Sequence, residues 1–380
     1  MRILFTGGGS GGHLSPITAV ARQLKEIASE KNIDLRLFYL GPSDFVNEFL
    51  EKEDIKVKTI LAGKLRRYFS FKTILDILKI PIGLIQAILF VYAWMPDVIF
   101  SKGGYGSVPA VFAGWLFRIP ILIHESDAIP GLANRLGGRL VKKIALSFSS
   151  SKKYFPLEKT ALIGNPIRLD LSYKNKEEGR KVFEISSDKP SAFSSEKVMD
   201  KPIILIMGSS QGAEAINEMV LKTLSQLLEK YEIIHICGQK NYEKHKEKIG
   251  PTLPKEYHLY PFLREDQLRY GYTLADLIIS RAGASSIFEI AAAQKPSILI
   301  PLPTAASDHQ RENAFEYAKS GGAVILEQTN LTPHLFLTEI SRILDNQELA
   351  QKMGEGAKSF STPEAGQKIA EELLNLLKYC

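Results

Sequence analysis

Cysteine is almost absent from this sequence of 380 residues, which contains only Cys237 and Cys380. Two cysteines so far apart exclude a disulfide framework and are typical of a protein in a reducing compartment. The sequence also lacks a His/Cys cluster with the spacing of metal ligands, and it lacks an Asp-x-Asp pair. We therefore expect no metal site and no bound cofactor, with at most a non-specific dependence on divalent cations.

Long hydrophobic runs are missing as well. The N-terminal run Ile3–Phe5 is too short for a signal peptide and predicts a strand. The longest apolar stretch predicts a helix of about 14 residues between Pro81 and Pro96, or ~21 Å, whereas a bilayer core needs ~30 Å. This helix is apolar almost all round, so we expect it either to be buried or to contact an apolar surface.

Strong net charge is also lacking. The 48 Lys and Arg residues exceed the 42 Asp and Glu residues by six. This mild excess is compatible with anionic ligands or an anionic membrane surface, and it does not indicate a nucleic-acid partner. The length is too great for a single hydrophobic core and predicts two domains.

Short apolar runs alternate with helical patterns along the whole chain. The runs are continuous and rich in Val, Ile and Leu, which is typical of parallel strands covered on both faces. In chain order they are ILFT, LRLFYL, DVIFS, ILIHE, ALIG, IILIMG, IIHICG, LIISR and SILIPLP. The fold class is therefore α/β, with a doubly wound parallel sheet of the Rossmann type formed twice.

The second half restarts the architecture at PIILIMGSSQGAEAIN, which gives a strand, a small-residue turn and a helix as at the N-terminus. We expect an N-terminal domain over residues 1–165 and a C-terminal domain over 166–358. Residues 186–201 are rich in Ser, Lys and Asp and predict a surface loop. We expect an amphipathic helix at about 360–380 to pack back on the first domain.

The first glycine-rich turn follows a predicted strand and precedes a predicted helix. Gly7, Gly9 and Gly12 match G-x-G-x-x-G, but the end of the second strand holds Leu40 and Gly41 instead of the acid that a dinucleotide needs. Because glycine is costly in backbone entropy, so many glycines favour close approach of the backbone to an anionic ligand over a plain turn.

His13 stands at the exit of this turn, at or near the first turn of the predicted helix. The positive end of a helix disfavours the imidazolium and so favours a neutral ring, which can accept a proton. His13 is therefore a candidate general base. A capping or packing role is the alternative interpretation.

Three other stretches carry candidate polar groups. Gly208–Asn217 follows a strand and could hold a phosphate, although a plain turn is equally consistent. Glu289 lies in an otherwise apolar helix and needs a defined partner, such as a pair of ribose hydroxyls; Ser285 or Ser286 could cap that helix. Thr304–Ala314 has amide and carboxylate groups that suit sugar hydroxyls, or else an ordinary N-cap with solvated side chains.

In the first half, SKGGYGSVPA and HESDAIPG both follow predicted strands. Glu125 and the Gly103-Gly104 turn should therefore lie at the carboxyl edge of the first sheet, where ligand sites form in α/β folds.

Together these motifs closely resemble the MurG family of glycosyltransferases, family 28. The matching stretches occur in the family's order over nearly the whole chain: TGGGSGGHLSP, SKGGYGSVPA, HESDAIPGLANR, GNPIR, GSSQGA, SRAGASSIFEIAAAQKP and DHQRENA. The resemblance implies two domains that face a central cleft, the GT-B arrangement. It implies inverting transfer of GlcNAc from UDP-GlcNAc to the 4-hydroxyl of MurNAc in lipid I, which makes lipid II for the cell wall.

The resemblance also implies the site residues. Catalytic candidates are His13, Glu125 and Asp127. Residues expected to bind UDP-GlcNAc are Ser10, Gly11, Gly12, Asp127, Arg168, Ser210, Gln211, Gly212, Phe262, Leu263, Ala284, Ser285, Glu289, His309 and Gln310. Residues expected on the acceptor and diphosphate side are Gly8, Gly9, Ser10, Gly103, Gly104 and Tyr105.

Within these sets the resemblance gives particular roles. Ser210 and Gln211 would meet the diphosphate with Arg168 nearby, and Glu289 would bind the ribose. Phe262 and Leu263 would lie beside the uracil. His309 and Gln310 would bind the GlcNAc hydroxyls.

Two positions depart from the family pattern. The family usually has H-E-Q-N where this chain has His124-Glu125-Ser126-Asp127, so Asp127 could compete with His13 as the base. A Gln-Gln pair is represented here by His309-Gln310.

The expected partners are UDP-GlcNAc, lipid I and the cytoplasmic face of the bacterial plasma membrane, with other cell-wall synthesis and division proteins in addition. Basic residues flank the Pro81–Pro96 stretch and suit a peripheral membrane contact: Lys64, Arg66, Arg67, Lys72 and Lys79. A UDP-GlcNAc 2-epimerase, a related glycolipid-synthesising transferase and a non-catalytic nucleotide-sugar-binding subunit remain alternatives.

Overall fold

The computed structural model describes residues 1–8, 11–42, 50–63, 71–171, 175–185, 201–208 and 213–377, without the side chains of residues 11 and 71–78. The loop expected at 186–201 lies outside this description except for its last residue. The chain forms two compact units. The first unit is Met1–Arg168 with Thr362–Cys380, and the second is Leu169–Ser361. Arg168 therefore belongs to the first unit and not to a C-terminal domain that begins at residue 166.

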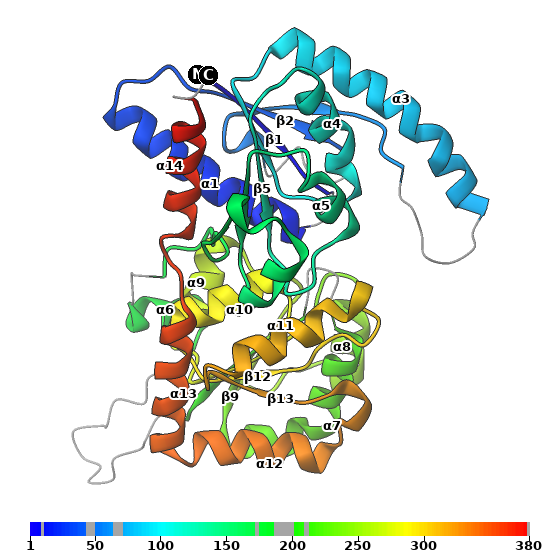
Figure 1. Cartoon of the computed structure of the whole chain (residues 1–380). Coiled ribbons are helices and arrows are strands. Elements are labelled where there is room, and N and C mark those ends of the chain that lie inside the picture. The colour runs from blue at the N-terminus through cyan, green and yellow to red at the C-terminus, as the bar shows by residue number, and fades with distance from the viewer. Residues whose placement is uncertain are drawn as a thin grey trace. The chain divides into compact units, whose positions relative to one another are not determined.

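The first unit contains a seven-stranded parallel sheet with the strand order β3-β2-β1-β4-β5-β6-β7 (Figure 1). Its strands are β1 (Arg2–Thr6), β2 (Arg36–Gly41), β3 (Ile55–Thr59), β4 (Val98–Ser101), β5 (Ile121–Glu125), β6 (Lys143–Leu146) and β7 (Thr160–Leu162). The central strands β1, β4 and β5 are buried along nearly their whole length, as continuous apolar runs predict.

Helices cover both faces of this sheet. Their bounds are α1 (Gly11–Glu30), α3 (Phe71–Trp94), α4 (Val108–Leu116), α5 (Leu132–Gly137) and α14 (Ala365–Leu376), with short 3-10 turns η1 (Tyr105–Ser107), η2 (Ser149–Tyr154) and η3 (Leu157–Lys159). On one face, Val20 and Leu24 of α1 share a core with Ile369 and Leu373 of α14 (Figure 1). On the other face, α3 and α4 pack over β1, β4 and β5.

Helix α3 begins ten residues before the predicted start, because Pro81 lies inside it instead of at its N-terminus. A proline within a helix loses only one main-chain hydrogen bond and need not end the helix. Ala87 and Val91 are fully buried, whereas Ile85 and Leu89 are 59% and 62% exposed. The helix therefore packs in the core on one side and presents apolar side chains on the other. Among the helices described, none is long and apolar enough to cross a membrane.

The second unit repeats the strand order in a six-stranded parallel sheet, β10-β9-β8-β11-β12-β13. Its strands are β8 (Ile203–Met207), β9 (Glu232–Ile236), β10 (Tyr257–Tyr260), β11 (Leu277–Ser280), β12 (Ser297–Leu299) and β13 (Ala323–Ile325). Counted from β1 or from β8, the first six strands follow the same 3-2-1-4-5-6 order. The expectation of two doubly wound parallel-sheet domains is therefore confirmed.

The helices of the second unit are α6 (Lys176–Val182), α7 (Glu214–Lys230), α8 (Tyr242–Ile249), α9 (Glu265–Leu274), α10 (Ala284–Ala293), α11 (His309–Ala318), α12 (Pro333–Leu344) and α13 (Gln347–Phe360), with 3-10 turns η4 (Ala306–Asp308) and η5 (Gln328–Asn330). Helices α7 and α12 share a core with one face of the sheet. In each unit the chain adds its first three strands towards one edge of the sheet and its later strands towards the other edge. The change of direction lies between β1 and β4 in the first sheet and between β8 and β11 in the second. Loops leaving the carboxyl ends of those two strands diverge there and leave room for a ligand.

Candidate active site

The carboxyl edge of the first sheet brings His13 against two glycine turns. His13 is the third residue of α1 and is half-buried. A Cβ atom added to Gly8 would lie 3.2 Å from Nε2 of His13, and one added to Gly104 would lie 3.2 Å from its Cε1. Gly104 also has a φ of 82°, which favours glycine. The sequence-predicted residues Gly8, His13 and Gly104 are thus neighbours, and a side chain at either glycine would crowd the ring.

Other residues predicted for this edge are placed as follows. Gly9 and Ser10 lie outside the described residues, and only the backbone of Gly11 is described, where α1 begins. Gly12 is exposed, with open space where its side chain would be. Tyr105 is exposed at the start of η1, beside the Gly103-Gly104 turn.

Glu125 ends β5 with its carboxylate inside the protein, only 4% exposed. Its oxygens accept hydrogen bonds from the backbone N–H groups of Asp127 at 3.0 Å and Gly131 at 3.2 Å, and from Nδ2 of Asn134 at 3.0 Å. Burial, followed by the negative charge of Asp127, raises the pKa of Glu125 to about 7, while Lys102 and these hydrogen bonds oppose the rise. Its carboxylate orders the loop between β5 and α5.

Asn134 links this carboxylate to the other turn. Gly103 has a φ of 84°, and a Cβ atom there would overlap the side-chain amide of Asn134. Glu125 and the Gly103-Gly104 turn, both predicted at this edge, are therefore joined through a residue that sequence reasoning did not select. Asn134 is part of the HESDAIPGLANR stretch, but nothing in its local pattern separates it from a solvated helix residue.

Lys102 is a second residue that sequence reasoning missed. It follows β4 directly, is 2% exposed, and donates a hydrogen bond from Nζ to Oγ of Ser126 at 2.7 Å. Burial lowers its pKa, and the charges of Glu125 and Asp127 counteract that shift. The only signal in the sequence is a lysine that comes directly after the buried run VIFS, where the next residue is a glycine.

His124 is excluded from direct contact with a substrate. Its side chain is fully buried, and Nε2 lies 3.0 Å from the carbonyl oxygen of Gly164 and 3.1 Å from Oγ of Ser147. Burial, together with the charge of Lys102, lowers the pKa of His124 well below its usual value, so the ring is neutral. The GNPIR stretch thus serves partly to anchor this ring. Arg168, at its end, accepts a hydrogen bond at its carbonyl oxygen from Nη1 of Arg22.

In the second unit, Glu289 lies in α10 and is 7% exposed. The hydroxyl of Tyr272, from α9, donates a hydrogen bond to its Oε2 at 3.0 Å. Glu289 therefore has a partner within the protein, and its contact with ribose hydroxyls stays a prediction. The predicted cap is wrong, because Gly283 is the N-cap of α10 and both candidate serines lie inside the helix. Ser285 is half-buried in the first turn, and Ala284 is 7% exposed.

Arg281 holds the carboxyl edge of the second sheet together. It is 5% exposed and donates from Nη1 to the carbonyl oxygens of Ile300 at 3.0 Å and Pro301 at 3.2 Å. Nη2 donates to Oε1 of Gln328 at 2.7 Å. Burial lowers its pKa to about 10, which leaves the guanidinium charged at neutral pH.

His309 and Gln310 begin α11, and the first offers a hydrogen-bond acceptor where the second offers a donor. Because a carbonyl oxygen only accepts, Nδ1 of His309 must donate its proton to the oxygen of Ala306 at 2.7 Å, which leaves Nε2 of the neutral ring as an acceptor. Oε1 of Gln310 accepts from the N–H of Leu302 at 3.0 Å, which leaves its amide nitrogen as a donor. Asp308 is the N-cap but makes no side-chain cap.

The remaining donor-site predictions fall in two loops. Phe262 is 55% exposed after β10, whereas Leu263 is 2% exposed and turned into the protein. Ser210, Gln211 and Gly212 follow β8 and lie outside the described residues.

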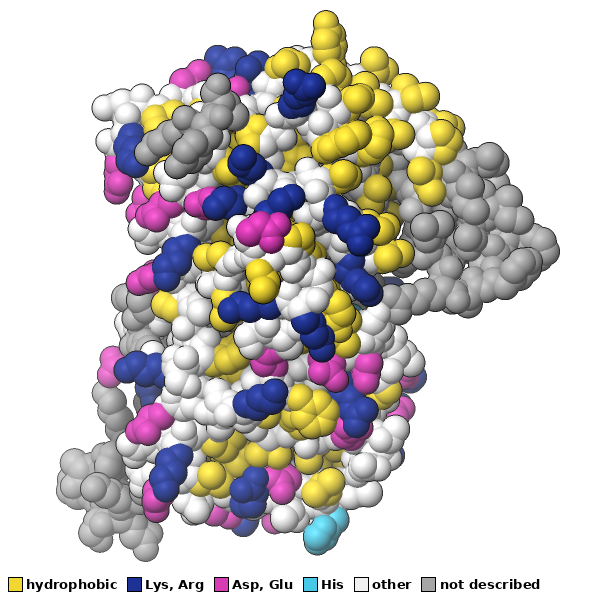
Figure 2. Space-filling model, viewed as in Figure 1, with side chains coloured by type: hydrophobic (Ala, Val, Ile, Leu, Met, Phe, Trp, Pro, Cys, Tyr) yellow, Lys and Arg dark blue, Asp and Glu magenta, His cyan; other side chains and the backbone are white. Residues whose placement is uncertain are grey.

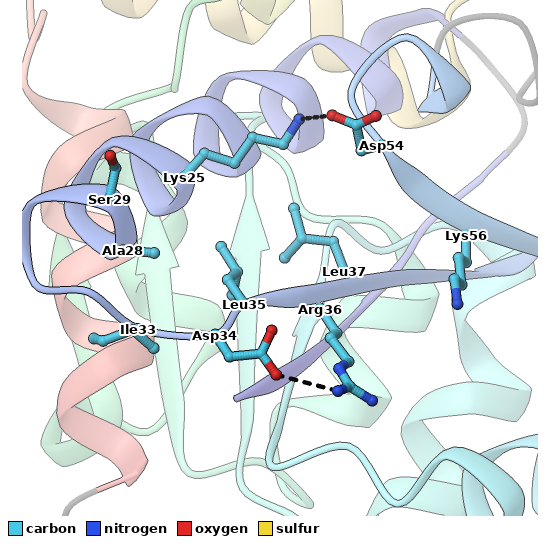
Figure 3. A pocket seen from close by; sticks show the side chains of 10 residues that line it. All are labelled: Lys25, Ala28, Ser29, Ile33, Asp34, Leu35, Arg36, Leu37, Asp54 and Lys56. Carbon is cyan, nitrogen blue, oxygen red and sulfur yellow. Dashed lines mark hydrogen bonds and ion pairs between the residues drawn. The ribbon is translucent and has the colours of Figure 1, made fainter.

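A hollow of about 420 Å³ lies at the opposite, amino edge of the first sheet (Figure 3). Ten residues line it: Lys25, Ala28, Ser29, Ile33, Asp34, Leu35, Arg36, Leu37, Asp54 and Lys56. Lys25 contacts Asp54 at 3.0 Å and Arg36 contacts Asp34 at 3.2 Å, so its charges largely pair with one another. The hollow lies away from the loops that carry the predicted site.

Apolar side chains gather on the surface of the first unit over α3 and α4 (Figure 2). We call this the α3–α4 apolar surface; its members are at least 44% exposed and are Ile82, Ile85, Leu89, Tyr92, Met95, Val108, Trp115 and Leu116. Ile82, Ile85, Leu89 and Tyr92 recur at helical spacing, so one face of α3 is apolar and solvent-exposed. Arg118 is the second residue after α4.

These features define the class of protein. The model of the glycosyltransferase family 28 N-terminal domain matches residues 3–146, and that of the family's C-terminal domain matches residues 203–369. The chain belongs to glycosyltransferase family 28.

Two curated relatives and two solved structures make the comparison more specific. A protein of Clostridium kluyveri is 39% identical over 344 residues, 90% of this chain and 91% of its own; it is named UDP-N-acetylglucosamine–N-acetylmuramyl-(pentapeptide) pyrophosphoryl-undecaprenol N-acetylglucosamine transferase. A Bacillus cereus protein with the same name and the number 2 is 36% identical, over 98% of this chain and 99% of its own. The crystal structure of Acinetobacter baumannii MurG has a TM-score of 0.73 and 28% identity, over 98% of this chain and 99% of that one. A UDP-GlcNAc 2-epimerase from Neisseria meningitidis shares the fold, with a TM-score of 0.67 and 14% identity over 99% of this chain and all of that one.

Proposed function

We propose that this protein transfers GlcNAc from UDP-GlcNAc to the 4-hydroxyl of MurNAc in lipid I and so makes lipid II. The full-length match to relatives named for this reaction supports the proposal. The observation in the molecule that carries it is the packing of His13 against Gly8 and Gly104, at the edge where an acceptor diphosphate can approach backbone N–H groups.

The second unit is the proposed donor-binding half. Glu289, oriented by Tyr272, accepts hydrogen bonds from the ribose hydroxyls, and exposed Phe262 stacks beside the uracil with the backbone of Leu263. His309 accepts a hydrogen bond from one GlcNAc hydroxyl, while Gln310 donates to another. Ser210, Gln211 and Gly212 hold the diphosphate, with Ala284 and Ser285 contributing small contacts.

The first unit is the proposed acceptor half, and His13 is the proposed base. His13 takes the proton from the MurNAc 4-hydroxyl as that oxygen bonds to C1 of GlcNAc. The bond from C1 to the diphosphate oxygen breaks on the opposite face, and UDP leaves with the electron pair, so the configuration at C1 inverts. Glu125 is a weaker candidate because three donors already hold its carboxylate. Half-buried Asp127 is the competing base.

The experiment is acceptor-dependent release of UDP, with the lipid product identified by mass. UDP release and a product heavier by one GlcNAc support the proposal. Conversion of UDP-GlcNAc to UDP-ManNAc without acceptor would overturn it in favour of an epimerase. Transfer to diacylglycerol but not to lipid I would indicate a different glycolipid synthase.

His13→Ala tests the base. A general base contributes about 10²–10⁴ in rate, so we expect turnover to fall by that factor while the Kd for UDP-GlcNAc stays within about twofold. His334→Ala is the matched control, since His334 is an exposed histidine of the second unit. Unchanged turnover would transfer the role to Asp127.

We also propose that the α3–α4 apolar surface rests on the anionic cytoplasmic face of the plasma membrane, where lipid I is found. Apolar side chains beside basic residues favour such an interface. Leu89→Glu should reduce binding to anionic vesicles at least tenfold. Phe315→Glu, in the second unit and also exposed, is the control and should bind as the parent does. Equal binding by both variants would place the membrane contact elsewhere.

A further inference from the structure

The buried lysine beside the acceptor edge has no role in the reaction as described above. Lys102 is 2% exposed, and an ammonium group held away from water is costly unless it has charged or polar partners. Its nitrogen donates to Ser126 at 2.7 Å. The negative charges that act on it are those of Glu125 and Asp127.

Ser126 and Asp127 are also the two positions where this chain departs from the H-E-Q-N pattern of its family. The hydrogen-bond partner of Lys102 is thus one departure, and an electrostatic partner is the other. Three residues from two loops therefore form one group, in which a hydroxyl and a carboxylate stand where the family pattern has two amides, with a buried ammonium beside them.

We propose that Lys102 is a positioning residue that holds the Ser126–Asp127 turn and balances the charge of the Asp127 carboxylate, and so fixes the orientation in which Asp127 meets the acceptor. This inference rests on the proposed function, and it concerns which chemical group of the acceptor can bind beside Asp127. A carboxylate only accepts hydrogen bonds, whereas an asparagine both donates and accepts. The acceptor group that faces Asp127 must therefore be a donor, such as a sugar hydroxyl or an amide N–H.

The charges around Lys102 support this role. Glu125, the last residue of β5, and Asp127, in the loop that follows, both attract the ammonium. His124, from β5, is kept neutral partly by the charge of Lys102. On the β1 side, a Cβ atom on Gly7 would lie 3.3 Å from Cβ of Lys102 and 3.7 Å from Cβ of His13, so the lysine stem also supports the turn that packs against His13. Without Lys102, the two carboxylates would face each other with no cation between them.

The test removes the charges singly and together. In Lys102→Met, we expect kcat/KM for the lipid acceptor to fall at least tenfold, and the acidic limb of its pH profile to move to higher pH. Asp127→Asn alone should also lose activity because it leaves the ammonium without that counter-charge. The triple variant K102M/S126Q/D127N is uncharged at these three positions and has the family's two amides at 126 and 127, so it should recover to within about fivefold of the parent. Lys58→Met, an exposed lysine on β3, is the control.

The Kd for UDP-GlcNAc should stay unchanged in Lys102→Met and in Lys58→Met. A triple variant no more active than Lys102→Met, or a Lys102→Met enzyme with the parent's activity and pH profile, would overturn the inference. A double-mutant cycle of urea unfolding, without any substrate, separates it from the proposed function. Coupling of at least fivefold in the unfolding constant is expected between Lys102→Met and Asp127→Asn, and strict additivity would overturn the pairing even if the parent made lipid II.

Discussion

The contact between Tyr272 and Glu289 makes the donor site of the second unit open to a sharp test. The phenol lies within hydrogen-bonding distance of two acceptors, Oε2 of Glu289 at 3.0 Å and the weaker acceptor Sδ of Met207 at 3.6 Å, and its side chain is fully buried. Tyr272→Phe keeps the ring and removes only the hydroxyl. The variant therefore changes the orientation of the Glu289 carboxylate without touching the nucleotide.

The size of the effect follows from the type of hydrogen bond. A bond to a charged group contributes about 1.5–3 kcal/mol to stability. For a unit of this size, that loss lowers Tm by roughly 3–12 °C. If the carboxylate must be held to receive the ribose, about 1.4 kcal/mol of the loss reappears in binding, which is a roughly tenfold higher Kd for UDP.

Isothermal titration calorimetry with UDP and a thermal melt give both quantities. Tyr231→Phe is the matched control, because its hydroxyl also makes one buried contact, 3.3 Å from Oγ of Ser341, away from the donor loops. It should lower Tm slightly and leave the Kd unchanged. An unchanged Kd in Tyr272→Phe, with Tm lowered, would refute the orienting role. An unchanged Kd in Glu289→Ala as well would refute the ribose contact itself.

Three further predictions concern stability and site geometry. Burial lowers the pKa of His245 to about 4, below the 6.5 of the unfolded chain, so its contribution to stability should be constant above pH 6.5 and fall by on the order of 3 kcal/mol towards pH 4. His124 and His235 add to this slope, because burial lowers their pKa as well. Urea unfolding of His245→Gln should therefore show a shallower slope than that of the parent, and an equal slope would contradict the assignment. Gly114→Val should destabilise by about 1–3 kcal/mol in a thermal melt, because any Cβ there overlaps Ile99, and an unchanged Tm would contradict the packing. Arg281→Met should cost about 1–3 kcal/mol and weaken UDP-GlcNAc binding in calorimetry, since two buried carbonyl groups lose their donor; full affinity would show that the loop before α11 does not need it.

The parallel sheets were predictable because their central strands are buried on both faces. IILIM in β8 and LIIS in β11 are continuous apolar runs that only such burial explains. The edge strand β3 was not predicted, because IKVKT is not a continuous apolar run: lysine alternates with apolar residues, and four of its five residues are exposed or half-buried. The start of α3 was missed for another reason. A proline is a strong local signal for the start of a helix, whereas Pro81 lies inside α3.

Residues of the candidate site were predictable only where the elements that place them are adjacent in the sequence. His13 could be placed at the first turn of α1, since the strand, the glycines and the helix follow one another directly. Lys102 could not, because its burial depends on a hydrogen bond to the next strand's loop, 24 residues further along the chain. Tyr272 is 17 residues from Glu289 and lies on a different helix, so no spacing rule joins them. Residues that position others are set by tertiary contacts, and sequence patterns do not record them.

The return of α14 to the first unit has a consequence for the order in which the protein is completed during synthesis. The second unit is one continuous segment, whereas the first unit needs Ile369, Leu373 and Leu376 to cover α1. A ribosome therefore releases every residue of the second unit before the first can close its core. Until then the side of α1 that α14 covers stays exposed to chaperones and proteases. A chain that ends before residue 362 would keep this apolar surface exposed and should be degraded faster than the full-length chain.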